Sequence, residues 1–145
     1  MSLFNSIDIS ATGLTAERLR MDIISENIAN AETTRTASGG PYRRKIPIYK
    51  ELESNDFSSV FSEALGNNKG NGVEVVGIKD DMSPFIRKFE PEHPDANEDG
   101  YVLLPNVNVV SEMINMVSAS KAYEANVTAM NSTKSMMMKA LEIGR

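Results

Sequence analysis

The stretch "NVVSEMINMVSASKAYEANVTAMNSTKSMMMKALEI", residues 108–143, decides the fold of this chain. Apolar residues recur along it at alternating steps of three and four, which places them on one face of an α-helix. The predicted helix is about 50 Å long, at about 1.5 Å per residue. So narrow and long a seam cannot be buried on a small domain, and it predicts a partner helix in this chain or another. The seam positions are Val109, Met113, Met116, Ser120, Tyr123, Val127, Met130, Lys134, Met137 and Leu141, and Val110, Ile114 and Val117 broaden its first half.

The first thirty residues carry a similar stripe and predict the partner. They favour an amphipathic helix of roughly 27 residues, about 40 Å long. The run "SGGP", residues 38–41, prevents its continuation, because glycine favours turns and proline restricts the residue before it. The stripe consists of Phe4, Ile7, Ala11, Leu14, Met21 and Ile28, and Ile24 widens it.

The middle of the chain is typical of β-structure. Short apolar or alternating runs at 45–49, 72–79, 85–89 and 101–104 are bounded by Gly, Pro, Asn and Asp. We expect one small, twisted β unit of three or four strands, marginally stable alone. A short helix is predicted between the first two runs, from Phe57 to Leu65.

The predicted fold class is therefore α+β. Residues 1–35 form an N-terminal helix, 36–105 a β-rich insertion with loops, and 106–145 a C-terminal helix that pairs with 1–35 in a helical hairpin resembling a coiled coil.

Composition excludes several functions. Fifteen basic against twenty acidic residues give a net charge of −5, which does not suit a nucleic-acid partner. The one dense basic cluster, Arg43 to Lys45, is interpreted as a solvated strand edge. The apolar runs are too short to span a bilayer, so we expect no membrane insertion. The first residues lack the basic and apolar stretches of a secretory signal peptide.

The inventory of reactive side chains is small. The chain has no cysteine and one histidine, His93, which lies between two prolines in an acidic segment. Disulfides, thiolate nucleophiles, zinc-thiolate sites and histidine pairs are therefore excluded. The acids from Glu90 to Asp99 are crowded in this loop segment rather than set in apolar surroundings. We expect neither an enzyme nor a bound cofactor or metal.

The segment "DANEDG", residues 95–100, begins like an EF-hand calcium loop. However, Asn106 stands at the twelfth position, where such a loop needs a bidentate glutamate, and Pro94 and Pro105 obstruct the two flanking helices. We interpret the segment as an Asx-rich turn that leads into the strand at 101–104, with Asn106 or Asn108 capping the long helix. The alternative is a calcium-regulated binding module with a methionine-rich target surface.

Methionines are concentrated in the C-terminal helix. Met136, Met137 and Met138 occupy most of its circumference, so they cannot all face one partner. The flexible thioether suits surfaces that adapt to non-identical partners. This pattern favours packing within a multi-subunit assembly over a simple intramolecular core.

Two terminal motifs resemble the flagellar rod and hook protein family. "SATGLTAERLRMDIISENIANAETT", residues 10–34, is similar to its N-terminal signature, and "PNVNVVSEMINMVSASKAYEAN", residues 105–126, to its C-terminal one. The text "TTRTASGGPYRRK", residues 33–45, replaces the family's usual Thr-Pro-Gly-Tyr, which together with the short middle segment is similar to a proximal-rod member. Lys121 stands where the family usually has arginine. The motif residues are Asn27, Ile28, Ala29, Asn30, Ala31, Asn106, Val107, Asn108, Tyr123, Glu124 and Asn126.

The resemblance implies a structural subunit of the flagellar rod, the drive shaft between the basal membrane ring and the hook. It implies export through the flagellar type III apparatus without a cleavable signal, and assembly across the periplasm. Expected partners are other proximal and distal rod subunits and the adaptor between rod and membrane ring. The seam residues of both helices are the expected subunit contacts, and the unpaired seams predict that the terminal helices order only on docking.

Overall fold

The computed structural model describes residues 3–37, 39–52, 61 and 70–143. Both long helices are confirmed as α1 (Leu3–Ala29) and α3 (Val109–Glu142). The four predicted strands are confirmed as β1 (Lys45–Glu51), β2 (Val73–Asp80), β3 (Ile86–Phe89) and β4 (Tyr101–Leu104), which establishes the α+β class. The short helix predicted from Phe57 to Leu65 lies outside the described residues, apart from Phe61.

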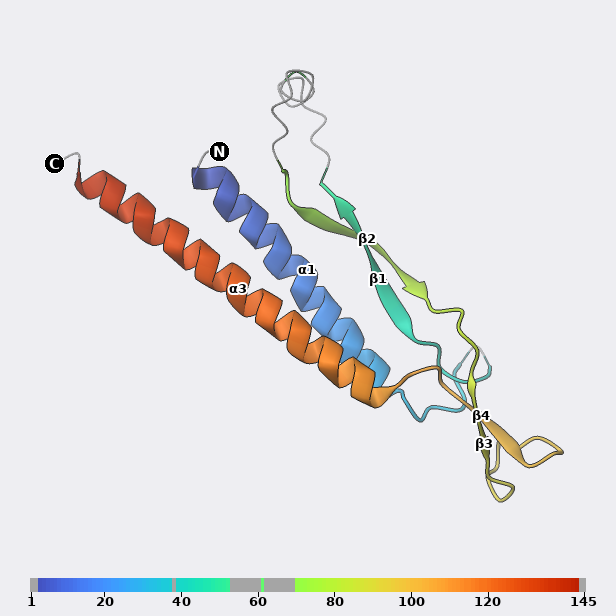
Figure 1. Cartoon of the computed structure of the whole chain (residues 1–145). Helices are drawn as coiled ribbons and strands as arrows, with labels where there is room; N and C mark the ends of the chain where they lie inside the picture. The colour runs from blue at the N-terminus through green and yellow to red at the C-terminus, as the bar shows by residue number, and fades with distance from the viewer. Residues whose placement is uncertain (1–2, 38, 53–60, 62–69, 144–145) are drawn as a thin grey trace.

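The two helices lie side by side and antiparallel, with both termini at one end of the molecule (Figure 1). α3 has 34 residues and α1 has 27. At about 1.5 Å per residue, α3 is about 10 Å longer. Its C-terminal end projects past the start of α1 (Figure 1), so the last turns of α3 have no intramolecular partner helix.

β1 and β2 form a long antiparallel hairpin, here called the arm, which runs beside α1 (Figure 1). Its register starts at Lys45 opposite Asp80, and a bulge lies between Ile48 and Tyr49. A two-stranded hairpin is at best marginally stable alone, so the arm needs its contact with α1.

The expectation of a single β unit is wrong. Within the described residues the four strands form two separate two-stranded sheets, β1 with β2 and β3 with β4. A turn after β2 accounts for the separation, because Asp81 Oδ1 accepts hydrogen bonds from the backbone N–H and the hydroxyl of Ser83, at 2.9 and 2.5 Å. The chain then continues through Pro84 and places the β3–β4 hairpin beyond the end of the helix pair (Figure 1).

The polar turns follow the sequence prediction closely. Asn97 Oδ1 accepts hydrogen bonds from the backbone N–H groups of Asp99 and Tyr101, at 3.1 and 2.8 Å, which confirms the Asx turn that leads into β4. Asn108 caps α3, since its side chain accepts from the N–H of Ser111 at 3.0 Å.

Candidate assembly interface

On α3, the line of contact with α1 is made of small and polar residues. The buried residues of α3 are Glu112, Ala119 and Thr133, which are separated by seven and by fourteen positions. A Cβ placed on Gly13 would lie 3.0 Å from Asn126 Nδ2, so Asn126 occupies the same line. Small residues at these positions allow the two backbones to approach closely. The buried α1 residues are Ser10, Ala16, Ile23, Ile24 and Asn27.

From Met113 to Met137, the predicted seam residues of α3 flank this line, either one position or four positions after its members. On α3, for example, Met113 stands beside Glu112 and Val127 beside Asn126. Most seam residues are therefore half-buried and keep part of their surface free. Those in this class are Ile7, Leu14, Met21, Ile28, Val109, Met116, Tyr123, Val127, Met130 and Met137. The exposed ones are Phe4, Ala11, Met113 and Leu141.

Four apolar residues form an outward stripe on the first half of α3, here called the outer stripe: Val110, Met113, Ile114 and Val117. Their exposed fractions are 67%, 55%, 65% and 60%. At about 100° per residue, Val110, Ile114 and Val117 point to the side of the helix opposite the buried line. The outer stripe therefore faces away from α1.

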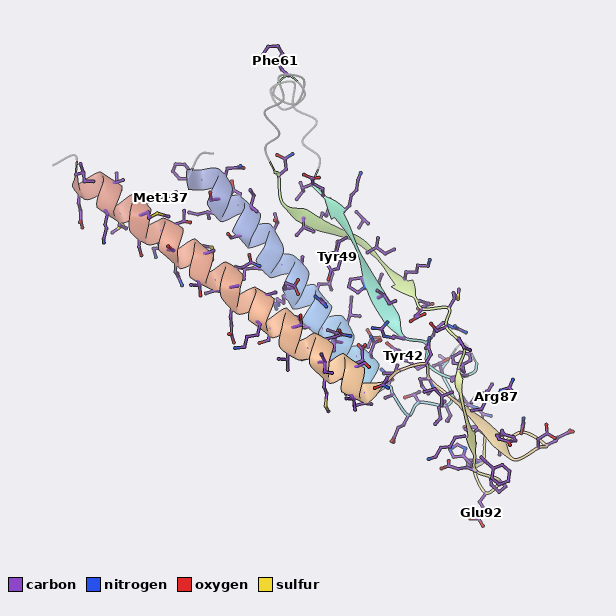
Figure 2. All side chains as sticks on the ribbon, in the orientation of Figure 1. Tyr42, Tyr49, Phe61, Arg87, Glu92 and Met137 are labelled. Carbon is purple, nitrogen blue, oxygen red and sulfur yellow. The ribbon has the colours of Figure 1, made fainter. Side chains whose placement is uncertain are left out.

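A second apolar group lies where α3 projects past α1. Leu141 falls on the side of α3 that faces α1, yet it is 74% exposed because α1 does not reach it. Met137 lies in the same overhanging region (Figure 2). We call the distal end the exposed apolar residues of this overhang together with Phe4 at the start of α1: Phe4, Met136, Met138, Leu141 and Ile143.

A network of polar side chains ties the opposite end of the helix pair to the arm. Glu112 of α3 is 1% exposed. Its Oε1 accepts hydrogen bonds from Nε and Nη2 of Arg44, at 3.0 and 2.7 Å, and Oε2 accepts one from Asn27 Nδ2 at 3.1 Å. A buried carboxylate needs such charged and hydrogen-bonded partners to offset its loss of solvation. We call the network the polar hub; its members are Asn27, Tyr42, Arg44, Asp81, Asn106 and Glu112.

Asn27 of α1 acts as a substitute strand neighbour for the start of the arm. Its Oδ1 accepts from the backbone N–H of Lys45 and its Nδ2 donates to the carbonyl of Lys45, both at 2.9 Å. These two bonds satisfy the peptide groups that an adjacent strand would otherwise pair. Asn27 is 1% exposed, so its side of each bond is buried.

Tyr42 closes the hub from the segment before the arm, and Figure 2 shows it at the junction of helix pair and arm. Its hydroxyl donates to Asn27 Oδ1 at 2.9 Å. Burial is the main cause that raises the pKa of Tyr42 to about 12, and the carboxylates of Glu26, Asp80 and Glu112 raise it further. Tyr42 is therefore a neutral hydrogen-bond donor across the physiological range.

Arg44 connects three segments of the chain. Besides Glu112, its guanidinium contacts Asp81 Oδ2 at 3.3 Å, and its backbone N–H donates to Asn106 Oδ1 at 2.9 Å. Burial alone would lower the pKa of Arg44, but the hydrogen bonds and charges of Glu112 and Asp81 raise it. Hydrogen bonds from Ser83, and then Arg44, lower the pKa of Asp81. The ion pairs are thus maintained at neutral pH.

The interpretation of Arg43 to Lys45 as a solvated edge is wrong. Arg44 is held in the polar hub, and Lys45 Nζ pairs with Glu26 at 2.5 Å. Arg43 lies over the ring of Phe85, 4.3 Å from its centre. Lys45 pairs with the end of α1, Arg44 with α3 and Arg43 with the segment after β2, and these tertiary contacts are not revealed by local sequence.

Several motif residues lie in or next to the hub. Asn27 and Asn106 are hub members, Asn108 is the cap of α3, and Val107 is 5% exposed beneath them. Asn30 Nδ2 donates to the carbonyl of Glu26 at 2.9 Å and so helps to end α1. The remainder lie at the end of α1 or farther along α3: Ile28, Ala29, Ala31, Tyr123, Glu124 and Asn126.

The calcium-like loop uses its own polar groups. Asp95 accepts a hydrogen bond from the Thr34 hydroxyl at 2.8 Å and pairs with Arg35 at 3.1 Å. Asn97 Oδ1 accepts the two hydrogen bonds of the Asx turn. The residues that match the first half of the EF-hand pattern therefore stabilise the loop itself. Across the described residues there is no group of three His, Cys, Asp or Glu side chains placed to hold a metal ion. Nothing in this geometry supports the calcium-regulated alternative.

Sequence reasoning missed the hub and the close-packed line. A glutamate inside an apolar helix, at Glu112, was a signal for a buried charge that needs a cation. The seven-residue spacing of Glu112, Ala119, Asn126 and Thr133 was a signal for the contact line, although apolar periodicity favoured its neighbours.

The helices of the described part of the chain are not long and apolar enough for any of them to cross a membrane.

Comparison with known proteins matches both ends of the chain to rod families. Residues 7–35 match the model described as "Flagella basal body rod protein", and residues 98–143 match "Flagellar basal body rod FlgEFG protein C-terminal". Full-length relatives carry one description, "Flagellar basal-body rod protein FlgC". The relative from Borreliella burgdorferi is 50% identical over 99% of this chain and 98% of its own length. Those from Bacillus subtilis and Salmonella typhimurium are 47% and 35% identical, each over 100% of both chains. The chain therefore belongs to the FlgC family of flagellar basal-body rod proteins and is a structural subunit of the rod.

Proposed function

We propose that this rod subunit joins its neighbours through the outer stripe and the distal end, and that both helices contribute to the wall of the proximal rod. The observation that carries the proposal is the outer stripe, four apolar residues between 55% and 67% exposed on the side of α3 that faces away from α1. A contiguous apolar surface of this kind marks an interaction site in a soluble protein.

The two apolar groups lie at opposite ends of α3. A contact between two different surfaces of successive subunits is head-to-tail, and such contacts generate an open helical filament when the rotation does not close a ring. The seam residues that flank the α1–α3 contact line supply further contact area. In this proposal torque passes through many apolar contacts in parallel, and the β-rich segment 36–105 braces adjacent subunits.

The partners proposed for these surfaces are other rod subunits, proximal and distal, and the adaptor between the rod and the membrane ring. Methionine at Met136 and Met138 suits contacts with non-identical neighbours. Because α1 and α3 already pair within the chain, ordering on docking concerns mainly the distal end.

The resemblance of the terminal motifs to rod and hook proteins also supports the route and place of assembly. We propose export through the flagellar type III apparatus without cleavage of a signal, and assembly across the periplasm. A purely structural role without catalysis or cofactor accords with the family and with the small inventory of reactive side chains.

An Ile114→Glu substitution tests this function. A charge in the outer stripe should abolish incorporation into isolated basal bodies and motility, while far-UV circular dichroism of the purified chain stays as in wild type. Thr128→Glu is the matched control, because Thr128 is an exposed polar residue on the same side of α3. Normal incorporation of the Ile114→Glu chain would refute the proposed contact.

A further inference from the structure

We propose that the polar hub is a latch that couples the order of the arm to the docking of α3 on α1. This inference goes beyond the proposed function and does not depend on it, since it concerns contacts within one chain.

The arm is fixed to α1 near both of its ends. At the base, the Asn27 side chain pairs with the peptide groups of Lys45. Toward the other end, the backbone N–H of Val73 donates to Thr12 Oγ1 at 3.2 Å. Asn27 and Thr12 are 15 residues apart on α1, or about 22 Å. Between them, Tyr49 projects from β1 toward α1 (Figure 2).

The contact at the base is completed only by α3. Asn27 Nδ2 has two N–H groups, and one donates to the Lys45 carbonyl while the other reaches Glu112 Oε2. Arg44, the residue before β1, places its guanidinium on Glu112 Oε1 through two bonds. Without α3, the second N–H of Asn27 and the Arg44 guanidinium lose their carboxylate.

The same residues also fix the outgoing strand. The Arg44 carbonyl accepts from the N–H of Asp81 at 2.8 Å, just after β2 ends. Asn106 Nδ2 donates to the carbonyl of Asp81 at 2.9 Å while its Oδ1 holds the N–H of Arg44. The segment that leads into α3 therefore holds both strands of the arm at their base, so docking of α3 positions the arm.

Replacement of the Glu112 carboxylate should separate the docking of α3 on α1 from the ordering of the arm. Gln at this position keeps the shape but turns one carboxylate oxygen into an N–H donor. In either orientation of the amide, its NH₂ group faces a donor, which is Asn27 Nδ2 in one orientation and the Arg44 guanidinium in the other. The negative charge that holds Arg44 is also lost. The apolar and small residues of the α1–α3 contact remain in place.

The test is hydrogen exchange of the full chain along a series of urea concentrations, which drive unfolding. Peptides within Lys45–Glu51 and Val73–Asp80 report on the arm, and peptides within Val109–Glu142 report on α3. In wild type the arm and α3 should lose protection at the same urea concentration. In Glu112→Gln, α3 should stay protected at urea concentrations where arm amides already exchange at least tenfold faster than in wild type.

Glu124→Gln is the control, because Glu124 is an exposed carboxylate of the same helix and pairs with Lys121 on the helix surface at 2.7 Å. In Glu124→Gln, the protection of the arm and the protection of α3 should still change at the same urea concentration. Arg44→Lys retains the charge but cannot bond to Glu112 and Asp81 in the same way. It should therefore separate the protection of the arm from that of α3, as Glu112→Gln does. If Glu112→Gln fails to fold, Arg44→Lys alone tests the latch. The latch is refuted if these two variants shift the loss of protection of arm and α3 together, or if the wild-type arm stays protected where α3 is not.

Discussion

Arg44 and Glu112 form a two-point contact that joins the start of the arm to α3. Arg44 Nε and Nη2 lie 3.0 and 2.7 Å from the same oxygen of a carboxylate that is 1% exposed. The pair connects residues 68 positions apart in the chain. It is therefore a tertiary determinant of the fold, unlike the exposed pair between Lys121 and Glu124 within one helix.

Removal of the cation should be costly. Arg44→Met leaves the Glu112 carboxylate buried without its charged partner, so the free energy of unfolding should fall by about 3–5 kcal/mol in chemical denaturation. Arg18→Met, at an exposed position of α1, should change it by about 0.5 kcal/mol or less. The double variant with Glu112→Met should regain most of the loss, and a double variant as unstable as Arg44→Met would contradict the assignment.

Tyr42 should make stability fall at alkaline pH. Its pKa is raised to about 12 in the folded chain, against 10.0 for the ordinary side chain. Above pH 10 the unfolded chain releases this proton while the folded chain keeps it, so the free energy of unfolding declines as pH rises from about 10 to about 12. Tyr42→Phe should remove this part of the decline and cost about 1 kcal/mol at neutral pH through the lost bond to Asn27. Denaturation at several pH values, with tyrosinate absorbance, measures both effects. An equally steep decline in Tyr42→Phe would contradict the assignment.

The close approach of the helices at Gly13 should appear as a coupling with Asn126. Alanine in a helix interior is favoured over glycine by about 1 kcal/mol. In the wild-type background this gain should be largely offset, because the new Cβ lies 3.0 Å from Asn126 Nδ2 and displaces that side chain. In an Asn126→Ala background the full gain should be recovered. Equal effects of Gly13→Ala in the two backgrounds would show that the residues do not interact.

Gly72 should be intolerant of a side chain. Its φ is +103°, and a Cβ there would collide with Thr12 Oγ1, which holds the N–H of Val73. Gly72→Ala should lower the free energy of unfolding by about 1–3 kcal/mol. Gly77→Ala is the control in β2, since a Cβ at Gly77 meets nothing within 4 Å. Similar stabilities of the two variants in chemical denaturation would argue against the Thr12 contact.

The helices and strands could be predicted from the sequence because the patterns that indicate them are local. Helical periodicity placed the long helices, and the turn residues placed the four strands and the Asn108 cap. The separation into two sheets was not predictable in this way, because strand pairing depends on the path of the chain after Asp81. The polar hub also escaped prediction, since Asn27, Arg44 and Glu112 meet only when three distant segments pack together.

The assembly surfaces could be predicted only as apolar faces of the two helices, without the division into buried and free residues. Apolar periodicity identified which residues lie along each helix, but it could not divide them between the intramolecular contact and the free surface. The offset of the contact line to Ala119 and Asn126 leaves Val117 and Ile114 exposed, and this depends on how closely the two backbones approach.

The reactivity of a single cysteine in the outer stripe tests whether rod subunits join through this face of α3. The natural chain has no cysteine, so Val117→Cys provides one unique thiol. We expect rapid maleimide labelling in the purified chain, loss of that labelling in isolated basal bodies, and its return after the same basal bodies are dissociated with acid and neutralised. Equal labelling of Val117→Cys in intact basal bodies and in the free chain would contradict assembly through this face of α3.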